Sequence, residues 1–139
     1  MVIGTLAIGA VAVGCGGSGG SLTKAEFINQ ADAICKKAEE ERLAGFQESP
    51  KVSASTSKKA MAAIQQRLLT AVVLPSIQTE AEELGDLAAP SGDEAKVAAI
   101  VEAYEQAVKE VEANPSTQGK AFPKFNKLAP EYGLKDCTV

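Results

Sequence analysis

Carboxylate side chains gather at two places in the sequence, and such clusters can perform acid–base catalysis or bind Ca²⁺. The first cluster is residues 39–41, and the second is Glu80, Glu82 and Glu83. Three consecutive residues of a helix spread over more than half of its circumference, so their carboxylates do not converge on one ion. We therefore expect residues 39–41 to lie on a solvated helix face, where Lys36 and Lys37 precede two of them by one turn.

The second cluster contains one closer pair of carboxylates. Glu80 and Glu83 are three residues apart and could form half of an ion site, but the sequence offers no second pair. Asp32 precedes Lys36 by one turn, a spacing typical of an ordinary helical ion pair. We therefore expect neither a metal site nor a cofactor.

Histidine is absent from the 139 residues, and this absence removes several mechanisms. Ser-His-Asp and Cys-His nucleophile pairs are excluded, as are zinc sites with histidine ligands and the Glu-x-x-His di-iron sites of helical bundles. An enzyme would have to work with carboxylates and lysine alone, and no spacing in the sequence indicates such a site. The sequence therefore predicts a protein that is not an enzyme.

The charge of the chain argues against nucleic-acid binding. The formal net charge is −4, and the basic residues are scattered, with Lys36–Lys37 and Lys58–Lys59 as the densest pairs. Binding to phosphates requires a cluster of lysine and arginine on one face. We expect no nucleic-acid partner.

The first 23 residues differ from the rest because they carry no charged side chain. Residues 2–13 are apolar or small, which suits the hydrophobic region of a signal peptide and is shorter than the about 20 residues that cross a bilayer. Small residues up to Gly14 followed by Cys15 resemble the bacterial lipobox, although leucine is usual where this chain has Ala12. The resemblance implies removal of residues 1–14 and attachment of lipid to Cys15. The alternatives are an ordinary secretory signal with an incidental cysteine, or an uncleaved anchor.

The segment after Cys15 has the composition of a tether. Residues 16–21 are glycine and serine only, and a flexible coil of this length spans about 13 Å. Residues 15–21 would then connect a lipid in the membrane to a domain formed by residues 22–139. Together with the lipobox, this predicts a position on the outer face of the cell membrane.

The chain has three cysteines, an odd number for an exported protein. If Cys15 carries lipid, Cys35 and Cys137 remain, and in an oxidising exterior we expect them to form a disulfide. The bridge would close a loop of about 100 residues. The alternative is that Cys35 is a small buried residue and Cys137 a free thiol.

The candidate residues must be positioned by helices, because apolar residues recur every three or four positions. A capping box of Thr23 and Glu26 starts a helix over residues 24–46, with Cys35 on its buried face. A second helix opens near Ser57 and runs to residue 88, with a kink or short break at Pro75.

Two further helices complete the predicted domain. Ser91 and Glu94 form a second capping box that starts a helix ending at Asn114. A last helix covers about residues 120–132 and turns at Gly133, so that Cys137 returns to the first helix. The predicted fold is all-α, an antiparallel four-helix bundle with up-down-up-down connections. Tyr104 and Tyr132 are interpreted as core residues with hydroxyls at the surface, or alternatively as gates of a pocket between helices.

Four segments of the chain carry a resemblance to a known group. They are residues 22–28, 31–35, 90–94 and 132–137, the last reading Tyr-Gly-Leu-Lys-Asp-Cys. In this order they resemble small envelope lipoproteins of actinobacteria to which no activity is assigned. The resemblance implies an exported helical domain with a bridge between Cys35 and Cys137, and it supplies no chemistry.

The sequence thus predicts a lipid-anchored envelope protein whose helical surface binds another envelope component. The alternative is a module that holds a small apolar molecule between helices near Pro75, where a kink could open the bundle.

Overall fold

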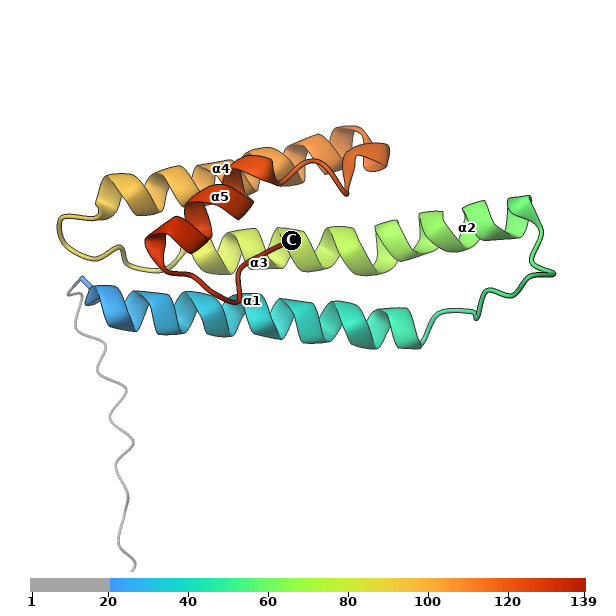
Figure 1. Cartoon of the computed structure of the whole chain (residues 1–139), viewed down its shortest axis with the longest axis horizontal. Helices are drawn as coiled ribbons and strands as arrows, with labels where there is room; N and C mark the ends of the chain where they lie inside the picture. Colours follow the sequence, from blue (N-terminus) through green and yellow to red (C-terminus); the bar gives the residue numbers. More distant parts are fainter. Residues whose placement is uncertain (1–20) are drawn as a thin grey trace, which may run out of the picture.

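Five α-helices form the part of the chain that the computed structural model describes, residues 21–139 (Figure 1). They are α1 (Lys24–Gln47), α2 (Lys58–Leu68), α3 (Leu74–Gly85), α4 (Glu94–Ala113) and α5 (Pro123–Tyr132). Residues 21–139 contain no strand. The predicted signal peptide at 1–14, Cys15 and all of the tether except Ser21 lie outside the described residues.

Helix α1 begins at the predicted capping box. The Thr23 hydroxyl accepts a hydrogen bond from the Glu26 amide at 3.2 Å, and the Glu26 carboxylate accepts one from the Thr23 amide at 2.9 Å. This pair satisfies amide groups that would otherwise lack partners at the helix start. The helix buries one stripe of small and aromatic side chains, namely Phe27, Ala31, Cys35 and Ala38. The prediction for this element is confirmed.

Helices α2 and α3 are joined by a π-helical turn, Leu69–Val73, into one continuous helix from Lys58 to Gly85. The Leu74 amide donates to the carbonyl of Leu69, five residues earlier. Pro75 follows directly at the start of α3, where its ring and missing amide would strain an ordinary α-helical turn. The predicted irregularity at Pro75 is therefore a widened turn, and the helix is not interrupted.

The start of α4 differs from the prediction. Ser91 does not cap the helix, which begins at Glu94 after Asp93, and the Glu94 carboxylate accepts from the Gly92 amide at 2.9 Å. Gly92 has a φ of 86°, so the chain makes a left-handed turn there and helical geometry starts two residues later than expected. The last helix likewise starts at Pro123 rather than 120, and it ends at Gly133 with a φ of 119°, as predicted.

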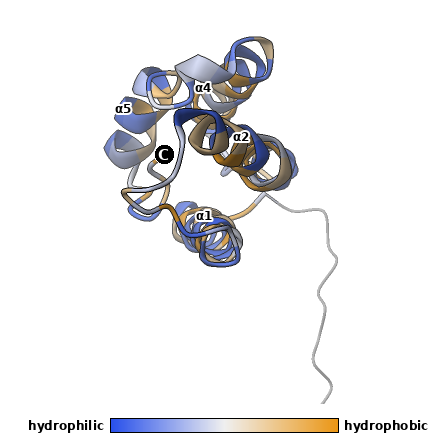
Figure 2. Ribbon diagram, turned by 90° about the vertical axis from the view of Figure 1, so that its right-hand side faces the viewer, coloured by the Kyte–Doolittle hydropathy of each residue, from blue (hydrophilic) through white to orange (hydrophobic). Residues whose placement is uncertain are grey.

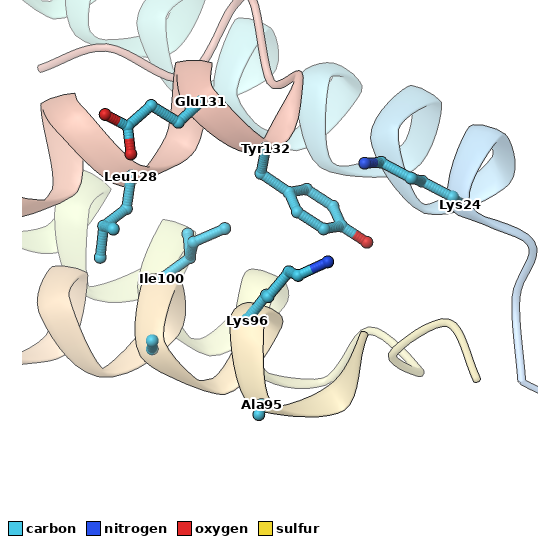
Figure 3. A pocket seen from close by; sticks show the side chains of 8 residues that line it. Lys24, Ala95, Lys96, Ile100, Leu128, Glu131 and Tyr132 are labelled. Atoms are coloured by element: carbon cyan, nitrogen blue, oxygen red, sulfur yellow. The ribbon is translucent and has the colours of Figure 1, made fainter. Parts of the chain in front are cut away.

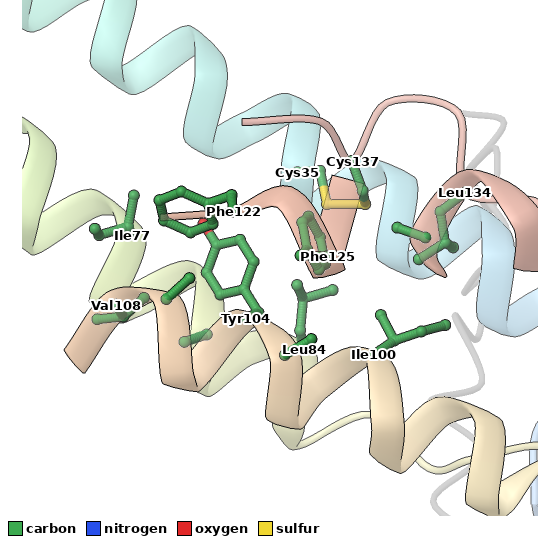
Figure 4. Packing of buried hydrophobic residues seen from close by; sticks show 14 of the residues in the cluster. Cys35, Ile77, Leu84, Ile100, Tyr104, Val108, Phe122, Phe125, Leu134 and Cys137 are labelled. Atoms are coloured by element: carbon green, nitrogen blue, oxygen red, sulfur yellow. A yellow bond between two sulfur atoms is a disulfide. The ribbon is translucent and has the colours of Figure 1, made fainter. Parts of the chain in front are cut away.

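The helices pack as an antiparallel bundle around a single core. Helix α3 lies between α1 and α4, and α5 packs on α4 (Figures 1 and 2). Rings from α4 and α5 meet at the centre, where Tyr104 and Phe125 have centroids 4.6 Å apart (Figure 4). The predicted four-helix bundle is confirmed, with α2 and α3 together forming its second helix.

Cys35 and Cys137 form a disulfide, as predicted, between positions 102 residues apart. The bridge fastens the C-terminal segment to α1, and both cysteines are buried (Figure 4). Asp32 reinforces this attachment, because its carboxylate accepts hydrogen bonds from the amides of Lys135 and Asp136 at 2.9 and 3.1 Å. The expected ion pair between Asp32 and Lys36 is therefore not formed.

Candidate functional site

Neither of the two predicted carboxylate clusters forms a site in which its carboxylates converge. Residues 39–41 are exposed on α1, as expected. Lys37 pairs with Glu83 of α3 at 2.8 Å, and this contact raises the pKa of the lysine. Within residues 21–139, no three acidic, cysteine or histidine side chains are placed to hold a metal ion.

Glu80 is the one buried charged residue of the described chain, with 2% of its surface exposed. One carboxylate oxygen, Oε2, accepts hydrogen bonds from Arg42 of α1 and from the Tyr104 hydroxyl of α4, both at 2.7 Å. Arg42 also donates to the Ser76 hydroxyl at 3.2 Å, and that hydroxyl donates to the Ala38 carbonyl at 3.3 Å. These contacts join α1, α3 and α4 across the core, so Glu80 is not half of an ion site.

The Tyr104 hydroxyl lies in this network and not at the surface, contrary to the prediction. Burial raises the pKa of Tyr104, and the adjacent Glu80 carboxylate raises it further. The phenol therefore stays protonated and donates to the carboxylate. No buried side-chain nitrogen or oxygen atom of the described residues lacks a hydrogen-bond partner, which is the arrangement that a buried charge requires.

Sequence reasoning did not single out Arg42, although its spacing contains the signal. Ala31, Cys35, Ala38 and Arg42 follow one another at intervals of four, three and four residues, so Arg42 continues the buried stripe of α1. Glu80 occupies the equivalent place in α3, three residues after Ile77 and four before Leu84. A long charged residue on each of two facing apolar stripes predicts a buried pair.

A surface groove between α1, α4 and α5 brings apolar side chains together with several convergent polar groups (Figure 3). Its volume is about 410 Å³. The apolar part of the wall comes from α4 and α5, and the polar part from the groups around Tyr132. The lining residues are Lys24, Ala95, Lys96, Ala99, Ile100, Leu128, Glu131 and Tyr132.

Tyr132 organises the polar side of the groove. Its hydroxyl donates to Asp93 at 3.1 Å, and the ammonium of Lys24 lies 4.4 Å from the centre of its ring. Removal from water and the bond to Asp93 raise the pKa of Tyr132 to about 12. Lys96 pairs with Asp93 at 2.7 Å, and this bond lowers the pKa of the carboxyl. The groove can accommodate an apolar group that has a polar end.

The surroundings of Pro75 are packed more tightly. A hollow of about 250 Å³ lies at the surface beside Pro75. Directly next to it, Gly45 of α1 approaches Val72 so closely that a Cβ atom on the glycine would lie 2.6 Å from Val72 Cγ1. Of the two places, the groove at Tyr132 offers more room for a ligand.

One helix of the described residues, Lys58–Gly85, has the length and composition of a segment able to cross a membrane. Core helices of soluble proteins meet the same criterion, but only 17% of the apolar window of this helix is buried.

Comparison of the chain with protein-family models, curated proteins and solved structures gives no match.

Proposed function

We propose that the protein is a lipid-anchored component of the cell envelope that works as a non-enzymatic interaction or structural module. The disulfide between Cys35 and Cys137 carries this proposal, because it accounts for two of the three cysteines and leaves Cys15 for another role. Structural disulfides persist in oxidising, extracytoplasmic surroundings. The apolar leader at 2–13, the glycine-serine tether and the resemblance to actinobacterial envelope lipoproteins support the same location.

The anchor is tested at Cys15 in the organism that makes the protein. Cells grown with radiolabelled palmitate should incorporate label into the natural chain and into a Ser18→Ala control. Cys15→Ala should carry no label and should leave the membrane fraction. Retention of the unlabelled variant in membranes would contradict lipid anchoring.

The non-enzymatic part of the proposal rests on how the buried polar groups are used. Inside the bundle, Arg42 and Tyr104 both donate hydrogen bonds to Glu80. These polar groups therefore hold the helices together and are not exposed to a substrate. The outer helix faces then remain as the working surface. Crosslinking in intact cells followed by mass spectrometry should recover a reproducible envelope partner. That partner should be lost with the released Cys15→Ala form, and recovery of no reproducible partner would count against the proposal.

The groove at Tyr132 supports a second candidate, an extracytoplasmic module that binds a small apolar molecule. Its apolar wall and polar rim fit a ligand with one polar end. Native mass spectrometry of protein from its own host should then show a bound species. Ala99→Phe, which fills the groove, should abolish this species, whereas Ala98→Phe on the exposed side of α4 should not. Ligand-free protein with no thermal shift across a lipid and metabolite panel would exclude this candidate.

A further inference from the structure

The end of the bundle formed by residues 43–67 is built differently from the rest. This region, the α2 tip, comprises the last turn of α1, the connecting loop and α2. Helix α2 buries none of its residues, and in Figure 1 it reaches beyond the ends of α1 and α4. Its larger apolar side chains, Met61, Ile64 and Leu68, are only half-buried, so the apolar side of this amphipathic helix is incompletely covered within the chain.

Apolar side chains are exposed mainly at this tip. The described residues include four large hydrophobic side chains that are exposed, and Leu43, Phe46 and Val52 lie in the tip. Phe46 is 41% exposed and borders a hollow of about 550 Å³ against the long helix. The half-buried side chains of Met61 and Ile64 extend the apolar surface along α2.

The α2 tip also has the opposite charge to the rest of the chain. Residues 43–67 contain four basic side chains and one acidic one, a net charge of +3. The remaining residues contain ten basic and seventeen acidic side chains. The four basic residues, Lys51, Lys58, Lys59 and Arg67, are all exposed. The wall of the adjacent hollow contributed by residues 115–118 carries no charge.

We propose that the α2 tip binds the surface of an anionic lipid bilayer. Exposed apolar side chains beside lysine and arginine are the combination that inserts shallowly into the interface between headgroups and acyl chains. Each basic residue near such a surface adds attraction to anionic headgroups. A contact with an acidic protein would use the charges equally well, but it would not require Leu43, Phe46 and Val52 to project into solvent.

The tip lies at the opposite end of α1 from the tether. A helix of 24 residues is about 36 Å long, so the proposed anchor at Cys15 and the α2 tip would be separate membrane contacts. With both engaged, α1 would lie along the membrane surface. The tip is formed wholly by described residues, so its binding does not depend on whether Cys15 is acylated.

The absence of tryptophan from the chain allows a specific test of the tip. Phe46→Trp places a single fluorophore at the proposed contact, and Val139→Trp places one at the fourth exposed hydrophobic position. The full chain is reconstituted with vesicles of phosphatidylglycerol and phosphatidylcholine in equal amounts. The tryptophan at position 46 should shift to shorter wavelength and be quenched by lipids brominated on their acyl chains. The tryptophan at position 139 should show neither effect.

The charge requirement is tested in the same vesicles. Lys58→Glu with Lys59→Glu should lower the apparent lipid affinity, measured by quenching at position 46, by at least about thirtyfold, because two attractive charges are lost and two repulsive charges replace them. Lys124→Glu with Lys127→Glu on α5 is the matched control and should have little effect. Vesicles of phosphatidylcholine alone should give weak quenching with the natural charges.

Three results would overturn the proposal. The first is that the tryptophan at position 46, like that at position 139, shows neither a blue shift nor quenching in anionic vesicles. The second is that charge reversal at positions 58 and 59 leaves the quenching at position 46 unchanged. A blue shift at position 46 without quenching, increasing with protein concentration, would instead assign the tip to contact with a second copy of the chain. Palmitate labelling at Cys15 is read out separately, so failure of the tip and failure of the anchor are distinguishable.

Discussion

Arg42 and Glu80 illustrate how much depends on single buried charges in a small bundle. Removing one partner leaves the other charge buried without compensation, at a cost of about 3–5 kcal/mol. We predict that Arg42→Met and Glu80→Leu are each strongly destabilising, and that the double variant is less destabilised than the sum of the two. Urea unfolding of the three variants measures this coupling.

The exposed pair of Lys37 and Glu83 provides the matched control. Its side chains are 54% and 36% exposed, so breaking it should change the free energy of unfolding by about 1 kcal/mol or less. If Lys37→Met and Arg42→Met proved equally destabilising, burial of the Arg42–Glu80 pair would not explain its contribution.

The raised pKa of Tyr104 predicts that the stability of the protein falls at alkaline pH. Its pKa is raised in the folded protein above the ordinary value of 10.0. Below pH 10 the phenol is protonated in both states, and above it only the unfolded chain releases the proton, so rising pH favours unfolding. Tyr104→Phe should be less stable by about 1–2 kcal/mol at pH 8 through loss of the hydrogen bond to Glu80, and this difference should narrow above pH 10.

The measurement for Tyr104 is urea unfolding between pH 8 and pH 11, in a background where Cys15 is replaced by serine to prevent thiol exchange. Phe122→Leu keeps both tyrosines, so its free energy of unfolding should change with pH in the same way as that of the natural protein across this range. If the difference in free energy of unfolding between the natural protein and Tyr104→Phe stayed constant from pH 8 to pH 11, the raised pKa of Tyr104 would be contradicted.

At the scale of elements, the sequence predicted helices better than helix ends. Periodic apolar positions predicted α1 and the long helix, because burial of a stripe is the main determinant of a packed helix, although the long helix ends at Gly85 and not at residue 88. The start of α4 was misplaced because Ser91, Gly92 and Glu94 also suit a turn, and only the positive φ of Gly92 decides between the two. The buried network was missed because a polarity pattern assigns arginine and glutamate to the surface, while their pairing depends on how α1 and α3 face each other.

The contact between α1 and the π turn depends on Gly45. A methyl group there would meet the branched Val72 side chain, which has little freedom to move, so we predict that Gly45→Ala destabilises the bundle by about 1–3 kcal/mol. Adding Val72→Ala should recover most of the loss. Gly85→Ala, where the nearest atom is 3.7 Å away, should instead be neutral or stabilising by about 0.5–1 kcal/mol. Thermal and urea unfolding of the four proteins check this, and equal effects of the two glycine substitutions would contradict it.

For the molecule as a whole, the two ends of α1 have different tasks. The end near Thr23 lines the groove through Lys24, while the middle of the helix holds the C-terminal segment through Asp32 and the disulfide at Cys35. The other end carries the α2 tip, which no further element covers. A bundle that is secured covalently at the middle of α1 and left open at the α2 tip is suited to contacts at that tip.

The disulfide should contribute substantially to the stability of this arrangement. Closing a loop of this length restricts the unfolded chain and is worth about 4–5 kcal/mol in the chain-entropy account. We predict that Cys35→Ala with Cys137→Ala lowers the free energy of unfolding by roughly that amount, measured with urea at pH 7. Asp32→Ala should cost more without the bridge than with it, because its hydrogen bonds to Lys135 and Asp136 are then the remaining polar attachment of the C-terminal segment to α1. If the cost of Asp32→Ala were the same in both backgrounds, the bridge and the carboxylate would be acting independently, and the C-terminal segment would not be the unit that they jointly secure.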